Sequence, residues 1–240
     1  RRRVPVATLH DLGLGFTDSD LAIDGSLGSP RRGAHATLAG PAFTVLDPEV
    51  THTREDALHA PGCGVLVALG GGSAVRRVGP GLAEEIARVL PHMPVRIAGG
   101  FTHGSPSTPR GSRVTWVHAP DGLAAALRES AIVVSAGGLT LYEAAALGRP
   151  AVALAVVAAQ RPTIAAFARR GAAVDAGFIG DADVVRRVVD AVAALAAEPT
   201  RAAHLGASAA RVIDGRGVFR VADALRELAA GGRRRGTHAA

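Results

Sequence analysis

The sequence predicts an α/β protein built on a doubly wound parallel sheet, with helices on both faces. From about Cys63 onward, short β-branched runs alternate with Gly-rich turns and with Ala/Leu/Arg segments of helical period. Strands that are apolar along their whole length and separated by helices are typical of a parallel sheet buried on both faces. Because 48% of the residues are hydrophobic and only 3% are aromatic, we expect a core of small aliphatic side chains.

The part of the chain after residue 60 contains six candidate strands. They cover residues 64–69, 95–98, 114–117, 132–134, 151–156 and a short run around 174. Helices are expected over about 75–90, from 120 onward, from 140 to 148, and over 162–170, 181–197, 199–213 and 216–229. The first of these helices has Leu82, Ile86 and Val89 at core spacing. Gly148 and Pro150 end the helix that begins near Thr140.

The first 60 residues have a different pattern. They contain two strand-like runs, 6–9 and 21–23, then a stretch that ends at Pro48, and a polar segment over 51–56. Two strands without enough helix do not make a stable domain. We therefore interpret residues 1–58 as the remnant of an N-terminal α/β domain with a linker, 59–230 as a Rossmann-like nucleotide-binding domain, and 231–240 as a disordered basic tail.

Composition argues against several classes of function. The formal charge is +6, but three arginines at each end of the chain account for it, so a basic nucleic-acid-binding face is not expected. Cys63 is the single cysteine, which excludes an internal disulfide and fits a reducing compartment. The nine histidines form no metal-ligand cluster, and the longest apolar run, 151–159, is shorter than the ~20 residues of a membrane span.

With no visible signal peptide, we expect a cytoplasmic location. The start at Arg1 suggests a fragment, and the sequence does not determine the oligomeric state.

The first Gly-rich turn, Gly70-Gly71-Gly72-Ser73, follows the first of the six strands. Glycine allows a ligand to approach the backbone closely, and the amides at a helix start attract anions. The turn is therefore a candidate phosphate loop. An equally good interpretation is a tight strand-to-helix turn with Ser73 as the helix N-cap.

The second Gly-rich turn contains Gly137 and Gly138, followed by Thr140 and Glu143. A carboxylate one turn into a helix can accept hydrogen bonds from both ribose hydroxyls, while the amides before it hold phosphates. However, Thr140 and Glu143 also match the capping box S/T-x-x-E. On these residues alone the capping box is the favoured interpretation.

Residues 135–150 (SAGGLTLYEAAALGRP), followed by Gln160, resemble the UDP-binding signature of GT-B-fold proteins. Those proteins include the lipid-II-forming N-acetylglucosaminyltransferases. The nearer resemblance is to the UDP-2,4-diacetamido-2,4,6-trideoxy-β-L-altropyranose hydrolases of pseudaminic acid synthesis and their spore-coat polysaccharide relatives. Three further segments favour that branch: 38–46 (LAGPAFTVL), 67–73 (VALGGGS) and above all 214–221 (DGRGVFRV).

The resemblance implies a GT-B-like fold with a UDP-sugar between two domains, and neither a cofactor nor a metal. In the positions of this sequence, Gly71, Gly72 and Ser73 are expected to face the diphosphate. Gly137, Gly138 and Thr140 are expected to contact phosphate or sugar, Glu143 the ribose and Gln160 the sugar, with uracil near the loop at His118. The implied activity is hydrolysis of a UDP-sugar to UDP and free sugar. The alternatives are a glycosyltransferase with a UDP-sugar donor and an inactive nucleotide-binding fragment.

This sequence also departs from the family. The family has a catalytic His beside a Gly-rich loop early in its first domain, and no Gly-His pair exists in this chain. On the order of a hundred residues of the first domain are therefore expected to be absent from this sequence, and the catalytic base is expected to lie there. His10-Asp11 stands where the family often has paired acids, and Ala159 stands where it commonly has Asn.

Overall fold

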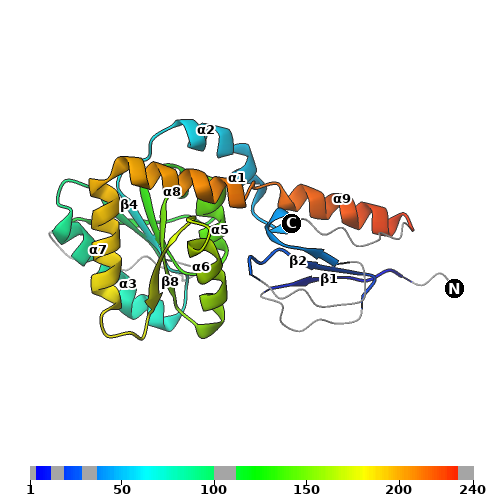
Figure 1. The fold of residues 1–240 in the computed structure, drawn as a ribbon, viewed down its shortest axis with the longest axis horizontal. Coiled ribbons are helices and arrows are strands. Elements are labelled where there is room, and N and C mark those ends of the chain that lie inside the picture. Colours follow the sequence, from blue (N-terminus) through cyan, green and yellow to red (C-terminus); the bar gives the residue numbers. More distant parts are fainter. Residues whose placement is uncertain (1–3, 12–18, 29–36, 100–111, 232–240) are drawn as a thin grey trace.

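The computed structural model describes residues 4–11, 19–28, 37–99 and 112–231, which form two parallel sheets with helices packed against them (Figure 1). The strands of the larger sheet are β4 (Val65–Ala68), β5 (Val95–Ala98), β6 (Val114–Val117), β7 (Ile132–Ser135), β8 (Ala151–Ala155) and β9 (Val174–Phe178). Their order is β6-β5-β4-β7-β8-β9, and every neighbouring pair is parallel. This order is the doubly wound one, in which the direction of strand addition reverses between β4 and β7. The predicted α/β class and its six strands are confirmed.

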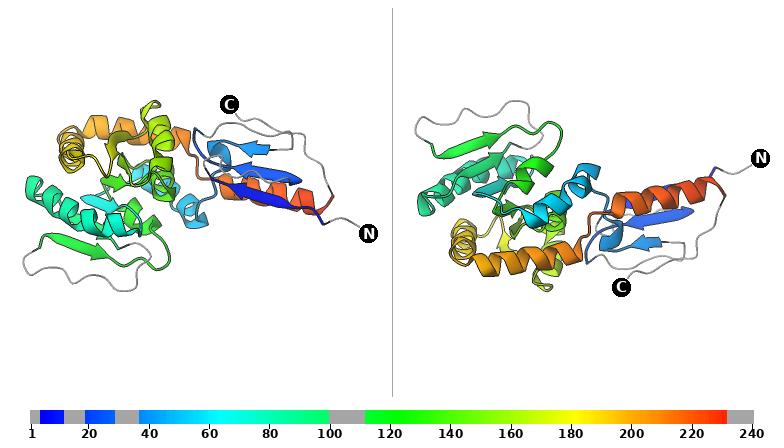
Figure 2. Two further views of the ribbon diagram at one scale, coloured as in Figure 1. Left: turned by 90° about the horizontal axis from the view of Figure 1, so that it is seen from below. Right: turned by 90° about the horizontal axis from the view of Figure 1, so that it is seen from above.

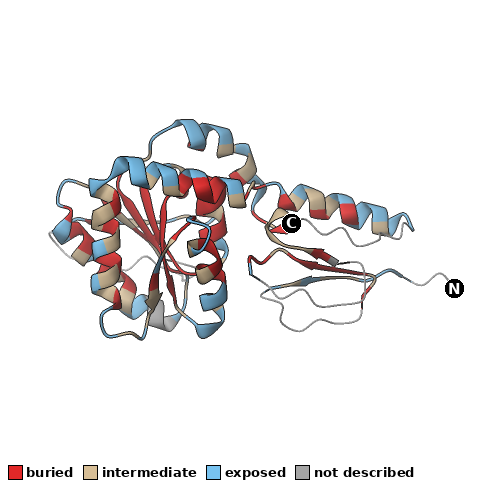
Figure 3. Ribbon diagram, in the orientation of Figure 1, coloured by how far each residue is buried: buried red, intermediate tan, exposed pale blue. Residues whose placement is uncertain are grey.

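Helices cover both faces of the larger sheet. They are α3 (Ser73–Val89), α4 (Ala124–Arg128), α5 (Leu139–Ala146), α6 (Arg161–Ala168), α7 (Val184–Ala197) and α8 (Pro199–Val212), with the short 3₁₀ turn η2 (Ala158–Gln160) before α6. Alternate residues of each strand enter two separate cores: Val65 packs with α3 and α7, and Leu66 with α5 and α6. The three central strands, β4, β7 and β8, are buried along their whole length (Figure 3). No helix in the described part of the chain combines the length and the hydrophobicity that crossing a bilayer requires.

One predicted core position in α3 is wrong. Leu82 and Ile86 are 1% and 0% exposed, as their spacing predicted, but Val89 is 37% exposed. Val89 is the last residue of its helix, which ends at the C-cap Leu90. The buried position at this end of the helix is Leu90 itself.

The smaller sheet has three parallel strands in the order β1-β2-β3: β1 (Ala7–His10), β2 (Leu21–Asp24) and β3 (Thr37–Ala39). The first two strands were predicted from the sequence, whereas β3, which is only three residues long, was not. After the 3₁₀ turn η1 (Pro41–Phe43) come α1 (Pro48–His52) and α2 (Arg54–His59), so the polar segment 51–56 of the predicted linker is mostly helical. Asp47 starts α1 by accepting a hydrogen bond from the Glu49 amide at 2.9 Å, with Pro48 at the first helical position.

The last helix, α9 (Gly217–Ala229), packs against the smaller sheet (Figures 1 and 2). Its Val221 and Ala224 share a core with Leu21 and Ile23 of β2, and with Leu38 and Phe43. The expectation that the first residues lack helical cover is therefore wrong, because the cover comes from the far end of the chain. The domain boundaries 1–58, 59–230 and 231–240 stay a prediction. Helix α9 was assigned to the second of these domains but packs against the smaller sheet. Residues 232–240, most of the predicted tail, lie outside the described residues.

The Asp214–Gly217 segment carries the chain from α8 to α9. Gly215 has φ +73°, a left-handed conformation that favours glycine. A Cβ atom at Gly217 would overlap the backbone carbonyl oxygen of Thr44, so only glycine fits there. Arg220 donates to the Ala42 carbonyl oxygen and to the Asp214 carboxylate, both at 2.9 Å. The need to pass the chain from the larger sheet to the smaller one therefore explains why these residue types stand in this segment.

Candidate nucleotide-binding site

The two Gly-rich turns lie at the carboxyl ends of adjacent strands. β4 pairs with β7 in parallel, with Ala68 opposite Ser135, and each turn follows directly from its strand. The strand order reverses between these two strands, and open α/β sheets bind ligands outside the carboxyl ends of the strands at such a point. The fold therefore places both predicted turns together, where a ligand is expected.

The first turn, Gly70–Gly72, leads into the 17-residue helix α3. Gly72 is the N-cap and no side chain caps the helix, while Ser73 is already its first residue. The alternative of Ser73 as the N-cap is therefore wrong. Cβ atoms placed at Gly70 or Gly72 would meet no described residue within 4 Å, so none of the described residues fills the space beside the turn. The N-cap glycine has no side chain that could accept from the amides at this helix end, so these amides are candidates for binding an anion.

The second turn leads into α5, whose N-cap is Gly138 and again has no side-chain cap. A capping box needs the hydroxyl residue at the N-cap, but Thr140 is the second residue of the helix. The capping-box interpretation of Thr140 and Glu143 is therefore wrong. Just before the turn, the Ser135 hydroxyl is fully buried and has no hydrogen-bond partner among the described residues.

Glu143 lies one turn into α5 and is half-buried. Its carboxylate has no hydrogen bond or ion pair with any described residue. Burial, and then the negative charge of Asp47, raise the pKa of Glu143 above its usual range. A carboxylate held in this way lacks the donors that would stabilise its charge, and a ligand with two adjacent hydroxyls would supply them.

Gln160, in η2, lies against the second turn. Its Oε1 accepts a hydrogen bond from the Val156 amide at 2.9 Å, which leaves its Nε2 as a donor. A Cβ at Gly137 would lie 2.9 Å from the Gln160 Cβ, and one at Gly138 would lie 3.8 Å from its Nε2. The structure thus brings Gly137, Gly138 and Gln160 together, with Thr140 and Glu143 further along the same helix.

The loop after β6 contains His118, which is exposed. Gly122, in the same loop, lies near Asp47: a Cβ there would be 3.5 Å from the Asp47 Oδ2. Asp47, in the segment after the smaller sheet, therefore lies near this loop, and its negative charge acts on the pKa of Glu143. Asp47 was not predicted as a site residue; its one signal in the sequence is the Asp-Pro pair, which is typical of a helix start.

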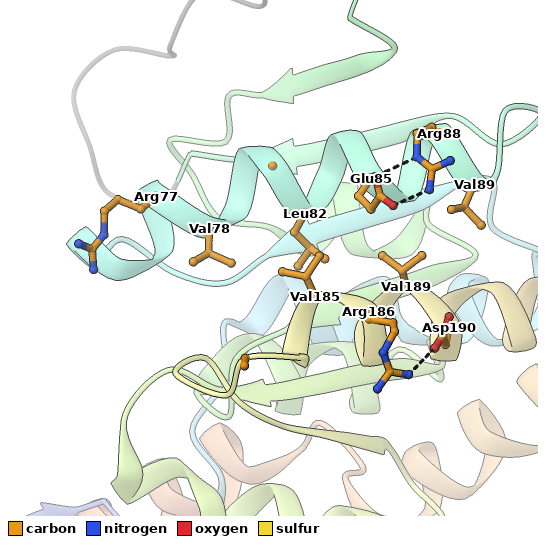
Figure 4. Close-up of a pocket in the computed structure, with 12 residues that line it drawn as sticks. Arg77, Val78, Leu82, Glu85, Arg88, Val89, Val185, Arg186, Val189 and Asp190 are labelled. Carbon is orange, nitrogen blue, oxygen red and sulfur yellow. Dashed lines mark hydrogen bonds and ion pairs between the residues drawn. The ribbon is translucent and has the colours of Figure 1, made fainter.

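A separate groove runs between α3 and α7 (Figure 4). Val78, Val185 and Val189 line it, and the ion pairs Glu85–Arg88 and Arg186–Asp190 flank it. None of the predicted site residues lines this groove. It is therefore distinct from the two Gly-rich turns.

The fold is that of the GT-B-like α/β proteins, with parallel sheets in both parts. Over 93% of this chain and 67% of the other, it superposes on the crystal structure of MurG from Acinetobacter baumannii, with a TM-score of 0.63 and 14% identity. A spinosyn rhamnosyltransferase, SpnG, complexed with thymidine diphosphate, matches 88% of this chain and 57% of its own with a TM-score of 0.54 and 17% identity. At these identities the likeness shows the fold alone.

In sequence, the chain is similar to the spore coat polysaccharide biosynthesis protein SpsG of Bacillus subtilis (strain 168), with 25% identity over 222 residues. The similarity covers 88% of this chain, which spans 65% of the length of that relative. No family model matches the chain.

Proposed function

We propose that this chain binds UDP at the carboxyl ends of β4 and β7 and supplies the nucleotide-binding half of a GT-B enzyme that acts on a UDP-sugar. One observation carries the proposal. Two helix starts without side-chain caps, those of α3 and α5, follow adjacent strands at the point where the strand order reverses. Paired helix N-termini suit a diphosphate, because each contributes free amides and a positive dipole end.

In this proposal each predicted residue keeps the role that its position supports. The turn at Gly71, Gly72 and Ser73 and the turn at Gly137 and Gly138 hold the two phosphates, with Thr140 beside them. Glu143 accepts hydrogen bonds from the ribose hydroxyls, and Gln160 donates its Nε2 hydrogens to the sugar. When the bond between the sugar's anomeric carbon and the phosphate oxygen breaks, the same amides stabilise the charge that develops on UDP.

Transfer of the sugar to an acceptor hydroxyl is the reaction we favour. Structural neighbours of this fold include a glycosyltransferase with a nucleoside diphosphate bound. The segment 214–217, which favoured a hydrolase in the sequence analysis, is explained by the crossover to α9 and does not bear on the nucleophile. Hydrolysis stays the second candidate because of the resemblance of 38–46 and the similarity to the spore coat protein. Incubation with a UDP-sugar separates the two: free sugar released without any acceptor would favour hydrolysis.

Gly72→Ala tests the site itself. Gly72 has φ −72° and open space around it, so alanine should change the free energy of unfolding by less than ~0.5 kcal/mol. The added methyl would intrude where a phosphate is expected, so the UDP dissociation constant measured by calorimetry should rise about tenfold or more. Wild-type protein without measurable affinity for UDP would refute the proposal. An unchanged affinity in Gly72→Ala would refute this placement of the diphosphate.

A further inference from the structure

The smaller sheet presents a carboxylate at its own carboxyl end. Asp11 follows β1, and its Oδ1 accepts a hydrogen bond from the Ser26 hydroxyl at 3.1 Å. Ser26 lies in the turn after β2, where its amide donates to the Asp24 Oδ1 at 2.9 Å. Asp24 and Ser26 are buried, whereas Asp11 is exposed. The buried pair thus fixes the turn, and the Ser26 hydroxyl orients a carboxylate that a ligand can reach.

The same turn rests on the larger sheet's helices. The Leu27 amide, one residue after Ser26, donates to the Tyr142 hydroxyl at 2.8 Å. Tyr142 is in turn held by Phe167, with ring centroids 5.1 Å apart and an edge-to-face angle of 81°. The turn residues therefore touch α5 one residue before Glu143.

A second contact places the turn beside Gln160. A Cβ at Gly28 would lie 3.1 Å from the Ala166 Cβ and 3.4 Å from the Pro162 carbonyl oxygen. Pro162 is two residues after Gln160, at the start of α6. Contacts thus link Gly137 and Gly138, through Gln160 and the first turns of α6, to the turn that carries Ser26.

Charge agrees with this placement. Burial is the main reason that the pKa of Tyr142 rises to about 12, and the charges of Asp11 and Asp24 raise it further. The hydrogen bonds from Ser26 to Asp11 and from Leu27 to Tyr142 place Asp11 on the side of the smaller sheet that faces α5.

We propose that Asp11, oriented by Ser26, binds the sugar part of the UDP-sugar from the smaller sheet, while Gln160 binds it from the larger sheet. This inference rests on the proposed function. A carboxylate accepts hydrogen bonds only, and the hydroxyl or amide groups of a hexose donate them. Gln160 offers an N–H donor and Asp11 offers acceptor oxygens, so the two complement different atoms of one sugar ring. Tyr142 is a positioning residue that acts through Leu27 and Ser26.

The test compares UDP with UDP-sugars by calorimetry on the 240-residue chain. The probes are UDP, UDP-N-acetylglucosamine, UDP-glucose and UDP-galactose. In Asp11→Asn, which keeps an oxygen for Ser26 but loses the charge, the dissociation constant for UDP should stay within about twofold. The ratio of the UDP-sugar constant to the UDP constant should rise about fivefold or more for at least one sugar. Tyr142→Phe should raise the same ratio by a smaller factor.

The matched control is Asp223→Asn, an exposed aspartate on α9 that pairs with Arg226. It removes one negative charge from the same part of the molecule, and the ratio should not change. If the ratio is unchanged in Asp11→Asn for all three sugars, or rises equally in the control, the inference is wrong although UDP still binds. If the wild type binds no UDP, the proposed function fails and the inference with it.

Discussion

The two sheets of this protein obtain their helical cover in opposite ways. The larger sheet is covered by helices that alternate with its own strands, α3 to α6, and by α7 and α8, which follow its last strand. The smaller sheet receives α9 from the far end of the chain, so that Val221 shares a core with Leu21. The larger sheet therefore forms from neighbouring segments, and the smaller sheet depends on a closure that costs more chain entropy.

This difference also separates the two halves of the candidate site. The residues expected to hold UDP all come from turns and helix starts within the larger sheet. The groups facing them from the other side, Asp11 and Ser26, are held in place by a sheet whose core needs α9. A destabilising substitution in the Asp214–Gly217 segment should therefore weaken binding of the sugar part more than binding of UDP.

Gly217→Val should have the largest effect. A Cβ at this position overlaps the Thr44 carbonyl oxygen, and backbone on both sides leaves no flexible side chain to move away. We expect a loss of about 3 kcal/mol or more of stability, concentrated in the smaller sheet. Hydrogen exchange should show lost protection in β2 and β3, with β4 and β7 still protected. Equal loss of protection in all four strands would show that the two sheets unfold together, and would contradict the conclusion that the smaller sheet alone depends on α9.

Gly81→Ala is the control for that variant. It lies in α3, is exposed, and has nothing within 4 Å of an added Cβ. Alanine is favoured over glycine inside a helix by about 1 kcal/mol, so the melting temperature should rise slightly.

Glu143→Gln tests whether the larger sheet holds the nucleotide. The dissociation constant for UDP should rise about 10- to 100-fold, since a charged acceptor is lost. Because burial and the charge of Asp47 destabilise the ionised form of Glu143, the melting temperature at neutral pH should not fall when the charge is removed. The control, Glu49→Gln on α1, should change neither quantity. A drop in melting temperature with unchanged affinity would assign Glu143 a structural role only.

The smallest expected effect is a shift with pH. The pKa of Glu143 is raised in the folded state, so the folded protein binds this proton more tightly than the unfolded chain. Its contribution to stability therefore declines as the pH rises from the ordinary glutamate pKa to the raised one. UDP binding, which uses the ionised form, should weaken as the pH falls through the raised pKa.

Asp47→Asn sharpens that test, because asparagine can still cap α1 but no longer repels the Glu143 charge. The acid limb of UDP binding should move to lower pH, with little change in affinity at neutral pH. Calorimetry across a pH series measures the shift. An acid limb that does not move would mean that Asp47 does not influence Glu143.

Local patterns in the sequence predicted much of the larger sheet. Continuous apolar runs marked its strands, and the Gly-rich turns at Gly70–Gly72 and at Gly137 and Gly138 marked where ligand chemistry could lie. The N-caps were harder to predict: Ser73 and Thr140 both have capping side chains, yet Gly72 and Gly138 begin the helices. Local propensity cannot decide such a choice when the fold brings two helix starts together at one edge of a sheet.

By itself, the sequence determined the α/β class and the composition of the two turns, because strand and helix periods and glycine conformations are local properties. Only the tertiary structure decided which helix covers the smaller sheet and that the turns after β4 and β7 are neighbours. It also decided that the turn carrying Ser26 contacts Tyr142 through the Leu27 amide. These features join residues that are far apart in the chain, and their pairing depends on strand order and on burial of apolar faces, which no local pattern encodes.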